Sequence, residues 1–177
     1  MDDKLLDNRI IVLNGEVDDN NVMEIIKKLL YLDSKNNDDI SLYINSCGGS
    51  VVDGLALIDC MNYIKSDVAT ICVGSAYSMG ALILASGQKG KRYALKNSEV
   101  MIHDISGGTY GNYKDISIRK ERMTKHRDSI INILCKSTNR SKKEIEKAID
   151  IDNYMSSEEA KDYRLIDNII FHPKGVK

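Results

Sequence analysis

The sequence has no tryptophan, one phenylalanine and one proline among its 177 residues. It also has little net charge, because 25 basic and 26 acidic side chains leave a formal charge of −1. That balance excludes a general attraction to nucleic acid or to anionic membranes. No apolar run approaches the roughly 18 residues that a membrane span needs, and Met1–Lys4 does not resemble a signal peptide. We therefore expect a cytoplasmic protein with neither nucleic-acid nor membrane partners.

The composition is that of a globular domain. Hydrophobic residues make up 42% and charged residues 29% of the chain, which excludes a disordered protein. The cysteines form no Cys-x-x-Cys pair and stand at no zinc-ligand spacing from the histidines, so we expect free thiols and no metal. We expect two of them, Cys60 and Cys72, in the core. The four are Cys47, Cys60, Cys72 and Cys135.

In the first half of the chain, short apolar runs alternate with segments in which apolar residues recur at helical spacing. This β-α-β order predicts an α/β fold with parallel strands and right-handed crossovers. The first helix is expected to bury Val22, Ile25, Ile26, Leu29 and Leu30. Strands are predicted over 10–13, 40–44 and 68–73, and Asn14-Gly15 is expected to end the first of them. Helices are predicted to begin at residue 18 or 19 and to span 52–64 and 81–86.

The second half has shorter elements and one long charged helix. Residues 113–136 are charged almost all round until Ile130, so this helix is expected to project from the domain or to pack on a partner. Ser141-x-x-Glu144 and Ser156-x-x-Glu159 have the pattern of capping boxes that open two short helices. Short strands are predicted over 93–95, 99–102 and 169–171.

One segment has the pattern of an exposed nucleophile. Ser78 lies among small residues in Gly74–Ala81, where a predicted strand gives way to a helix. Such a turn lifts a serine Oγ clear of the backbone, and the N–H groups that follow can face a developing oxyanion. Small residues also occur where a helix simply packs on a sheet, so the motif alone leaves both interpretations open.

A serine nucleophile needs a base, and the base needs an acid that orients it. His103 is the candidate base, because it follows an apolar strand and precedes a glycine-rich segment. His126 on the charged helix and His172 in the C-terminal tail fit surface positions.

The acid and the oxyanion donors are less well defined by the sequence. Asp104 is adjacent to His103, but adjacent strand residues point to opposite faces. Asp150 and Asp152 fit better, and periodicity does not choose between them. The candidate oxyanion donors are the N–H of Met79 and one N–H from Gly48-Gly49.

Five motifs, in this order, cover nearly the whole chain. They are Tyr43-Ile44-Asn45-Ser46-Cys47-Gly48-Gly49-Ser50-Val51, Ala76-Tyr77-Ser78-Met79-Gly80-Ala81, Gly90-Lys91-Arg92-Tyr93-Ala94-Leu95, Met101-Ile102-His103 and Asp152-Asn153-Tyr154-Met155-Ser156. With them the sequence resembles the ClpP family, the proteolytic subunits of ATP-dependent Clp proteases. The resemblance implies a catalytic triad of Ser78, His103 and Asp152, with Gly49 and Met79 as the oxyanion hole.

The resemblance also implies a fold, an assembly and a function. The fold would be a crotonase-like spiral in which a single domain, 1–177, has a head of about 1–104 and 137–177 and a handle of about 105–136. Heptameric rings, stacked as a tetradecamer, would enclose a chamber where unfolded polypeptides delivered by an AAA+ Clp ATPase are cut by a serine endopeptidase. This chemistry implies no metal and no cofactor. Substrate is expected to bind as a strand along Ser50, Val51, Val52, Ile105, Ser106, Gly107 and Gly108.

Several positions depart from the family pattern. Cys47 replaces a proline and Ile151 replaces an arginine. Asp104 and Ile105, which follow the histidine, replace a glutamine and a proline. Arg164 replaces a glycine, and we expect it to adopt the backbone geometry that glycine favours. Only eight residues precede Arg9, where relatives have a pore-lining segment. These departures leave open a weakly active or scaffold subunit of mixed rings, or a stand-alone maturation protease. A crotonase-type acyl-CoA enzyme is a further alternative, on a related fold.

Overall fold

The structure is a computed structural model that describes residues 2–171, and it has an α/β fold, as predicted. One seven-stranded sheet runs in the order β1-β2-β3-β4-β7, with β5 paired to β3 and to β6. The strands are β1 (Ile10–Val17), β2 (Ile40–Gly49), β3 (Val68–Tyr77), β4 (Arg92–Leu95), β5 (Glu99–Ile102), β6 (Asn153–Ser156) and β7 (Asn168–Ile170). The helices are α1 (Asp2–Asp7), α2 (Asp19–Lys35), α3 (Val51–Tyr63), α4 (Met79–Ala85), α5 (Tyr113–Thr138), α6 (Lys142–Ile149) and α7 (Ser157–Asp162).

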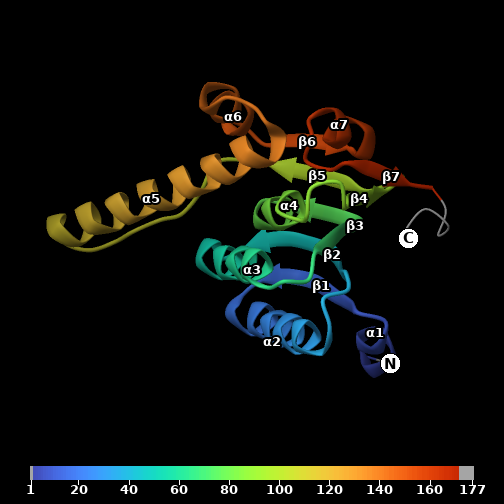
Figure 1. The fold of residues 1–177 in the computed structure, drawn as a ribbon. Coiled ribbons are helices and arrows are strands. Elements are labelled where there is room, and N and C mark those ends of the chain that lie inside the picture. The colour runs from blue at the N-terminus through green and yellow to red at the C-terminus, as the bar shows by residue number, and fades with distance from the viewer. Residues whose placement is uncertain (1, 172–177) are drawn as a thin grey trace.

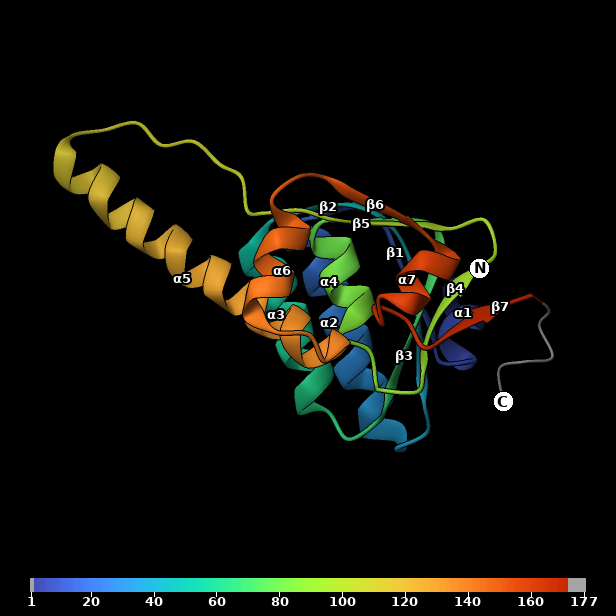
Figure 2. The same cartoon turned by 90° about the horizontal axis from the view of Figure 1, so that it is seen from above.

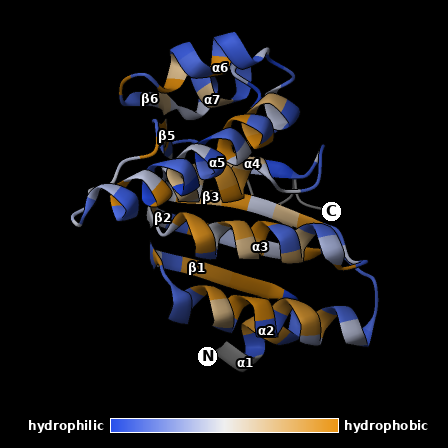
Figure 3. Ribbon diagram, turned by 90° about the vertical axis from the view of Figure 1, so that its left-hand side faces the viewer, coloured by the Kyte–Doolittle hydropathy of each residue, from blue (hydrophilic) through white to orange (hydrophobic). Residues whose placement is uncertain are grey.

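Helices α2, α3 and α4 lie along one face of the sheet, and α5 extends far from the body (Figures 1 and 2). The sheet pairs are parallel, as the β-α-β order predicts, except for the antiparallel pair of β5 with β6. Every residue of α4 is buried, so the helix that begins directly after Ser78 forms part of the core. Figure 3 shows that β1 and β3 are largely hydrophobic, whereas α5 is more hydrophilic.

The first three strands are longer than the sequence predicted. β1 does not end at Asn14-Gly15 but continues to Val17, with a register shift against β2. Gly15 absorbs the irregularity at φ +88°, a conformation that glycine adopts without steric cost. β2 and β3 likewise continue past a second register shift, and they carry the chain to the glycine pair and to Ser78.

Other predictions also need small corrections. Leu30 is 45% exposed, and Leu32 is buried in its place on α2. Cys72 is buried, whereas Cys60 is half-buried against the core. The sequence pattern predicts neither α1 nor β6, because each is short and β6 is partly polar. All four cysteines are free.

Helix ends follow the predicted capping chemistry. Asp18 caps α2, and both predicted capping boxes are present at α6 and α7. α5 begins after the N-cap Asn112 and buries side chains only in its second half, which confirms the expected projection of the first half. Arg164 has φ +70°, the geometry expected from its replacement of a glycine. None of the helices in residues 2–171 is both long and apolar enough to cross a membrane.

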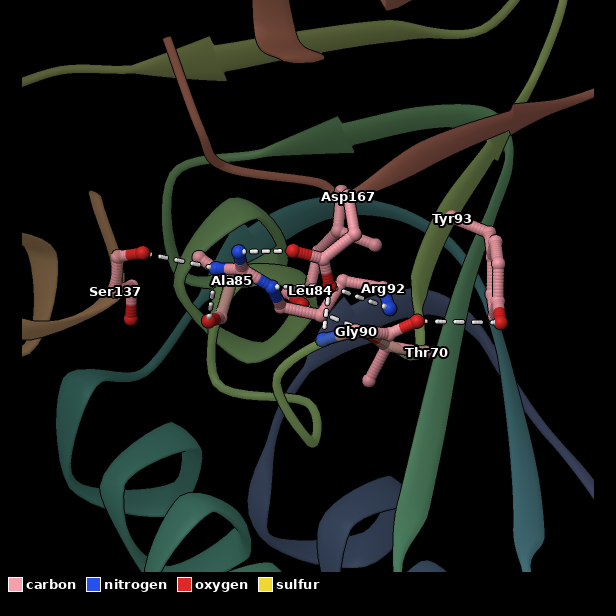
Figure 4. A network of polar contacts seen from close by, with 8 residues as sticks. All are labelled: Thr70, Leu84, Ala85, Gly90, Arg92, Tyr93, Ser137 and Asp167. Atoms are coloured by element: carbon pink, nitrogen blue, oxygen red, sulfur yellow. Dashed lines mark hydrogen bonds and ion pairs between the residues drawn. The ribbon is translucent and has the colours of Figure 1, made fainter. Parts of the chain in front are cut away.

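A buried ion pair ties the outer strands to the core (Figure 4). Arg92, 3% exposed, donates from Nη2 and Nε to the two carboxylate oxygens of Asp167 at 2.7 and 2.9 Å. Its Nη1 donates to the carbonyl oxygens of Ala85 and Ser137. The pair therefore joins β4, α4, the end of α5 and the segment before β7. Burial opposes ionisation of Asp167, but hydrogen bonds from Arg92 outweigh it and lower the pKa of this carboxyl.

Candidate active site

Ser78 stands at the turn between β3 and α4. Its φ of +52° and ψ of −120° are a backbone conformation that few non-glycine residues adopt. The turn is fixed on both sides, because the Ser78 N–H donates to the Met101 carbonyl at 2.8 Å and its own carbonyl accepts from Ala81 and Leu82. The strained turn leaves the hydroxyl free to face His103 rather than to cap the helix.

His103 contacts both Ser78 and Asp152 through its two ring nitrogens. The distance from Nε2 to the Ser78 Oγ is 2.9 Å, and the distance from Nδ1 to the Asp152 Oδ1 is 3.1 Å. With Nδ1 protonated toward the carboxylate, Nε2 is the acceptor that a base requires. The His103 side chain is 28% exposed and that of Asp152 is 56% exposed, so the site opens to solvent at its acidic end.

Strand order explains why residues so far apart in the sequence meet. β5 lies between β3 and β6 in the sheet, and Tyr77, Met101 and Tyr154 are cross-strand partners. Ser78 follows β3, His103 follows β5, and Asp152 precedes the antiparallel β6, so the three lie at the same edge of the sheet.

The structure separates the three candidate acids. Asp152 is the one that contacts His103. Asp104 instead accepts from the Arg127 Nε at 2.8 Å, which connects the residue after His103 to α5. Asp150 is the exposed C-cap of α6.

The other two histidines do not take part in this chain of contacts. His126 lies on α5 beside Arg122, and His172 falls outside the described residues.

The two glycines of β2 have different neighbours. A Cβ on Gly48 would lie 2.7 Å from the Ser78 Cβ and 3.1 Å from the Met79 nitrogen, so only glycine lets β2 approach the serine so closely. A Cβ on Gly49 would instead meet the Val17 carbonyl oxygen of β1. The Gly48 N–H donates to the Ser46 Oγ at 3.1 Å, so it is already paired.

A groove of about 610 Å³ is lined by residues that follow Gly49 and His103 in the sequence. All seven predicted substrate residues line it, from Ser50–Val52 on one wall and 105–108 on the other. α5 also contributes groove residues that the sequence pattern was not used to predict. They recur at spacings of three and four residues, which places them on one face of the helix. They are Ile116, Arg119, Lys120, Arg122, Met123 and His126.

The arrangement provides a nucleophile, a base and an oriented carboxylate. Within residues 2–171, no group of three or more His, Cys, Asp or Glu side chains is placed to hold a metal ion.

Residues 1–173 match the Clp protease family, a range that includes every candidate site residue. This family membership implies a peptidase that forms ring-shaped oligomers and works with Clp ATPases. Because the match covers nearly the whole sequence and the fold agrees with it, the chain belongs to the Clp protease family.

Proposed function

We propose that this peptidase is a serine endopeptidase with Ser78 as nucleophile, His103 as base and Asp152 as the orienting acid. The observation that supports it most is the chain of two hydrogen bonds from Ser78 Oγ through the imidazole to Asp152. As Ser78 Oγ bonds to the peptide carbonyl carbon, His103 Nε2 takes its proton, and Asp152 stabilises the imidazolium that forms.

The tetrahedral intermediate then collapses to an acyl-enzyme. The C–N bond breaks, and His103 returns the proton to the departing amine. The same imidazole takes a proton from water as that water attacks the ester carbonyl. The C–Oγ bond then breaks, His103 returns the proton to the Ser78 Oγ, and the carboxylic acid product leaves.

The oxyanion would be held by the N–H groups of Met79 and Gly49. Met79 is the first residue of α4, so its N–H has no acceptor within the helix. For Gly49 the support comes from strand geometry, because successive amides point to opposite edges of a strand. The Ser50 N–H donates to the Val17 carbonyl on β1. On a regular strand the preceding amide, that of Gly49, would point to the opposite edge of β2, where β3 and Ser78 lie.

Unfolded polypeptide would bind in the groove as an added strand. Backbone pairing gives affinity with little demand on sequence, and the open backbone of Gly107 and Gly108 suits such a contact. We propose that the ring oligomer is a heptamer stacked in pairs, that it encloses the sites in a chamber, and that a Clp ATPase delivers unfolded chains to it.

The direct test compares Ser78→Ala with Ser75→Ala. Both remove a hydroxyl from neighbouring positions, but Ser75 bonds to Asn45 and lies away from His103. Ser78→Ala is expected to lose about 10⁴-fold in turnover of a fluorogenic peptide, and to lose fluorophosphonate labelling, while Ser75→Ala keeps both.

Two outcomes would contradict the proposal. Near-normal hydrolysis by Ser78→Ala would exclude Ser78 as the nucleophile. A folded wild type that is neither labelled nor active would favour the scaffold subunit of mixed rings.

A further inference from the structure

Three side chains beside the candidate triad form a cluster that the catalytic proposal does not use. The Tyr77 hydroxyl donates to the Glu99 Oε1 at 2.5 Å. The Tyr77 ring also meets the Tyr154 ring edge-on, with centroids 5.7 Å apart and planes at 82°. One tyrosine therefore contacts two other strands, β5 and β6.

Each member stands close in sequence to one triad residue. Tyr77 directly precedes Ser78, and Tyr154 follows Asp152 by two residues. Glu99 opens β5, the four-residue strand that ends just before His103. The cluster thus connects the three segments that carry the nucleophile, the base and the acid.

The segment that bears Asp152 has the greatest need of such a connection. β6 is a four-residue strand that pairs in the sheet with β5. Asp152 is more than half exposed, and Ile151 before it is 74% exposed, so packing around the carboxylate is sparse. The Tyr154–Tyr77 contact links β6 directly to β3 across β5.

Both contacts have geometries that restrict movement. A phenol that donates to a carboxylate makes a charge-assisted bond, and an edge-to-face aromatic pair fixes the angle between rings. The hydrogen bond to Glu99 raises the pKa of Tyr77 to about 12. The hydroxyl therefore keeps its proton, and remains a donor, throughout the physiological pH range.

We propose that Tyr77, Glu99 and Tyr154 form a positioning cluster that holds His103 and Asp152 in register with Ser78. The inference rests on the proposed serine mechanism. None of the three touches the reacting atoms, so they act by reducing the motion of the segments that carry the triad. Small displacements of a catalytic group carry large rate penalties, which makes such restriction valuable.

The test separates the two contacts with paired variants. Tyr77→Phe and Glu99→Ala remove the hydrogen bond, whereas Glu99→Gln keeps an acceptor. Tyr154→Leu removes the aromatic edge, whereas Tyr154→Phe keeps it. Tyr93→Phe on β4 is the control, because it removes a tyrosine hydroxyl that donates to the carbonyl of Gly90, two residues before that strand and away from the triad.

The readouts are kcat and KM for a fluorogenic peptide and the rate of fluorophosphonate labelling. We expect the three disruptive variants to lose about tenfold in kcat and in labelling rate with unchanged KM, because the groove residues are untouched. Glu99→Gln and Tyr154→Phe should recover most of this loss. The double variant Tyr77→Phe/Glu99→Ala should be no worse than either single change.

Three results would overturn the positioning cluster. They are kcat and labelling rates within twofold of wild type in all disruptive variants, losses equal to those of Tyr93→Phe, and equal losses in the conservative and disruptive variants. A wild type that is not labelled at Ser78 would instead refute the serine mechanism, and the cluster with it.

Discussion

Asp152 is a half-exposed carboxylate that, in the proposed mechanism, orients His103 through its contact with Nδ1. Asp152→Asn places an amide where the imidazole N–H needs an acceptor charge, so a loss of about 10⁴-fold in kcat is expected, as for the acid of other triads. Asp150→Asn is the matched control, two residues away and without a contact to His103. Comparing kcat for the two proteins tests the assignment, and equal losses would contradict it.

Gly48 allows a second test at the scale of one residue. Gly48 and Gly15 have similar φ values, +92° and +88°, so alanine is strained to a similar degree at both. Only at Gly48 would the new methyl group meet Ser78 and Tyr77. Gly48→Ala is therefore expected to displace the nucleophile and to lower kcat by about 10²-fold.

A Cβ on Gly15 would meet no atom within 4 Å, so Gly15→Ala should cost less stability than Gly48→Ala and should have little effect on kcat. Thermal unfolding and peptide hydrolysis measured on both variants separate the two effects. Equal kcat values for the two proteins would show that Gly48 has no special role at the serine.

At this scale the sequence indicated which residues the structure brings together better than it indicated their contacts. Small residues around Ser78 and the position of His103 pointed to the site, but only the family resemblance chose Asp152 over Asp150. The Tyr77–Glu99 bond was not predictable, because it joins residues 22 positions apart on strands whose pairing was unknown.

Among the elements, β4 and β7 depend on the buried Arg92–Asp167 pair. Asp167 has a pKa lower when folded than when unfolded. Its contribution to stability is therefore complete above the unfolded value, about 4, and is lost as the pH falls through the folded value. Asp167→Asn leaves Arg92 buried without its counter-ion and is expected to cost about 3 kcal/mol at neutral pH.

Urea denaturation of wild type and Asp167→Asn over a pH series checks both statements. The difference between the two proteins should be constant from pH 7 to about pH 5 and should shrink at lower pH. A difference that does not change down to pH 3 would contradict the linkage.

Element types were predicted well where periodicity or caps were strong, and element ends less well. The pattern that predicts α2 and α5 lies on one helix face, and the pattern that predicts each capping box lies within one helical turn. β1–β3 continue beyond their apolar runs because parallel pairing with a neighbour, which is not encoded locally, satisfies their backbones. β6 was missed for the same reason, since only its pairing with β5 makes it a strand.

For the whole molecule, the exposed Ile151 beside Asp150 bears on how rings associate. The family resemblance implies an arginine here that would form an ion pair between rings, and the isoleucine leaves that contact without its cation. We expect wild-type protein to form a labile double ring, with single heptamers abundant and weakly active at low concentration.

Ile151→Arg should raise both the tetradecamer fraction and the peptidase rate. Sedimentation velocity at several protein concentrations checks this expectation. Ile151→Lys tests the effect of charge alone, and Ile151→Ala tests the loss of the apolar side chain. A wild type that stays a tetradecamer below micromolar concentration would contradict it.

The position of Asp152 after Ser78 and His103 in the sequence also has a consequence for biosynthesis. A ribosome makes the chain from its N-terminus, and domains fold as their residues emerge. Ser78 and His103 are synthesised well before β6, the strand that follows the carboxylate and pairs with β5. A nascent or prematurely terminated chain that ends before residue 152 therefore has a serine and a histidine but no acid to orient them. Dependence on late-synthesised residues would keep unfinished chains from cutting other proteins while they are still on the ribosome.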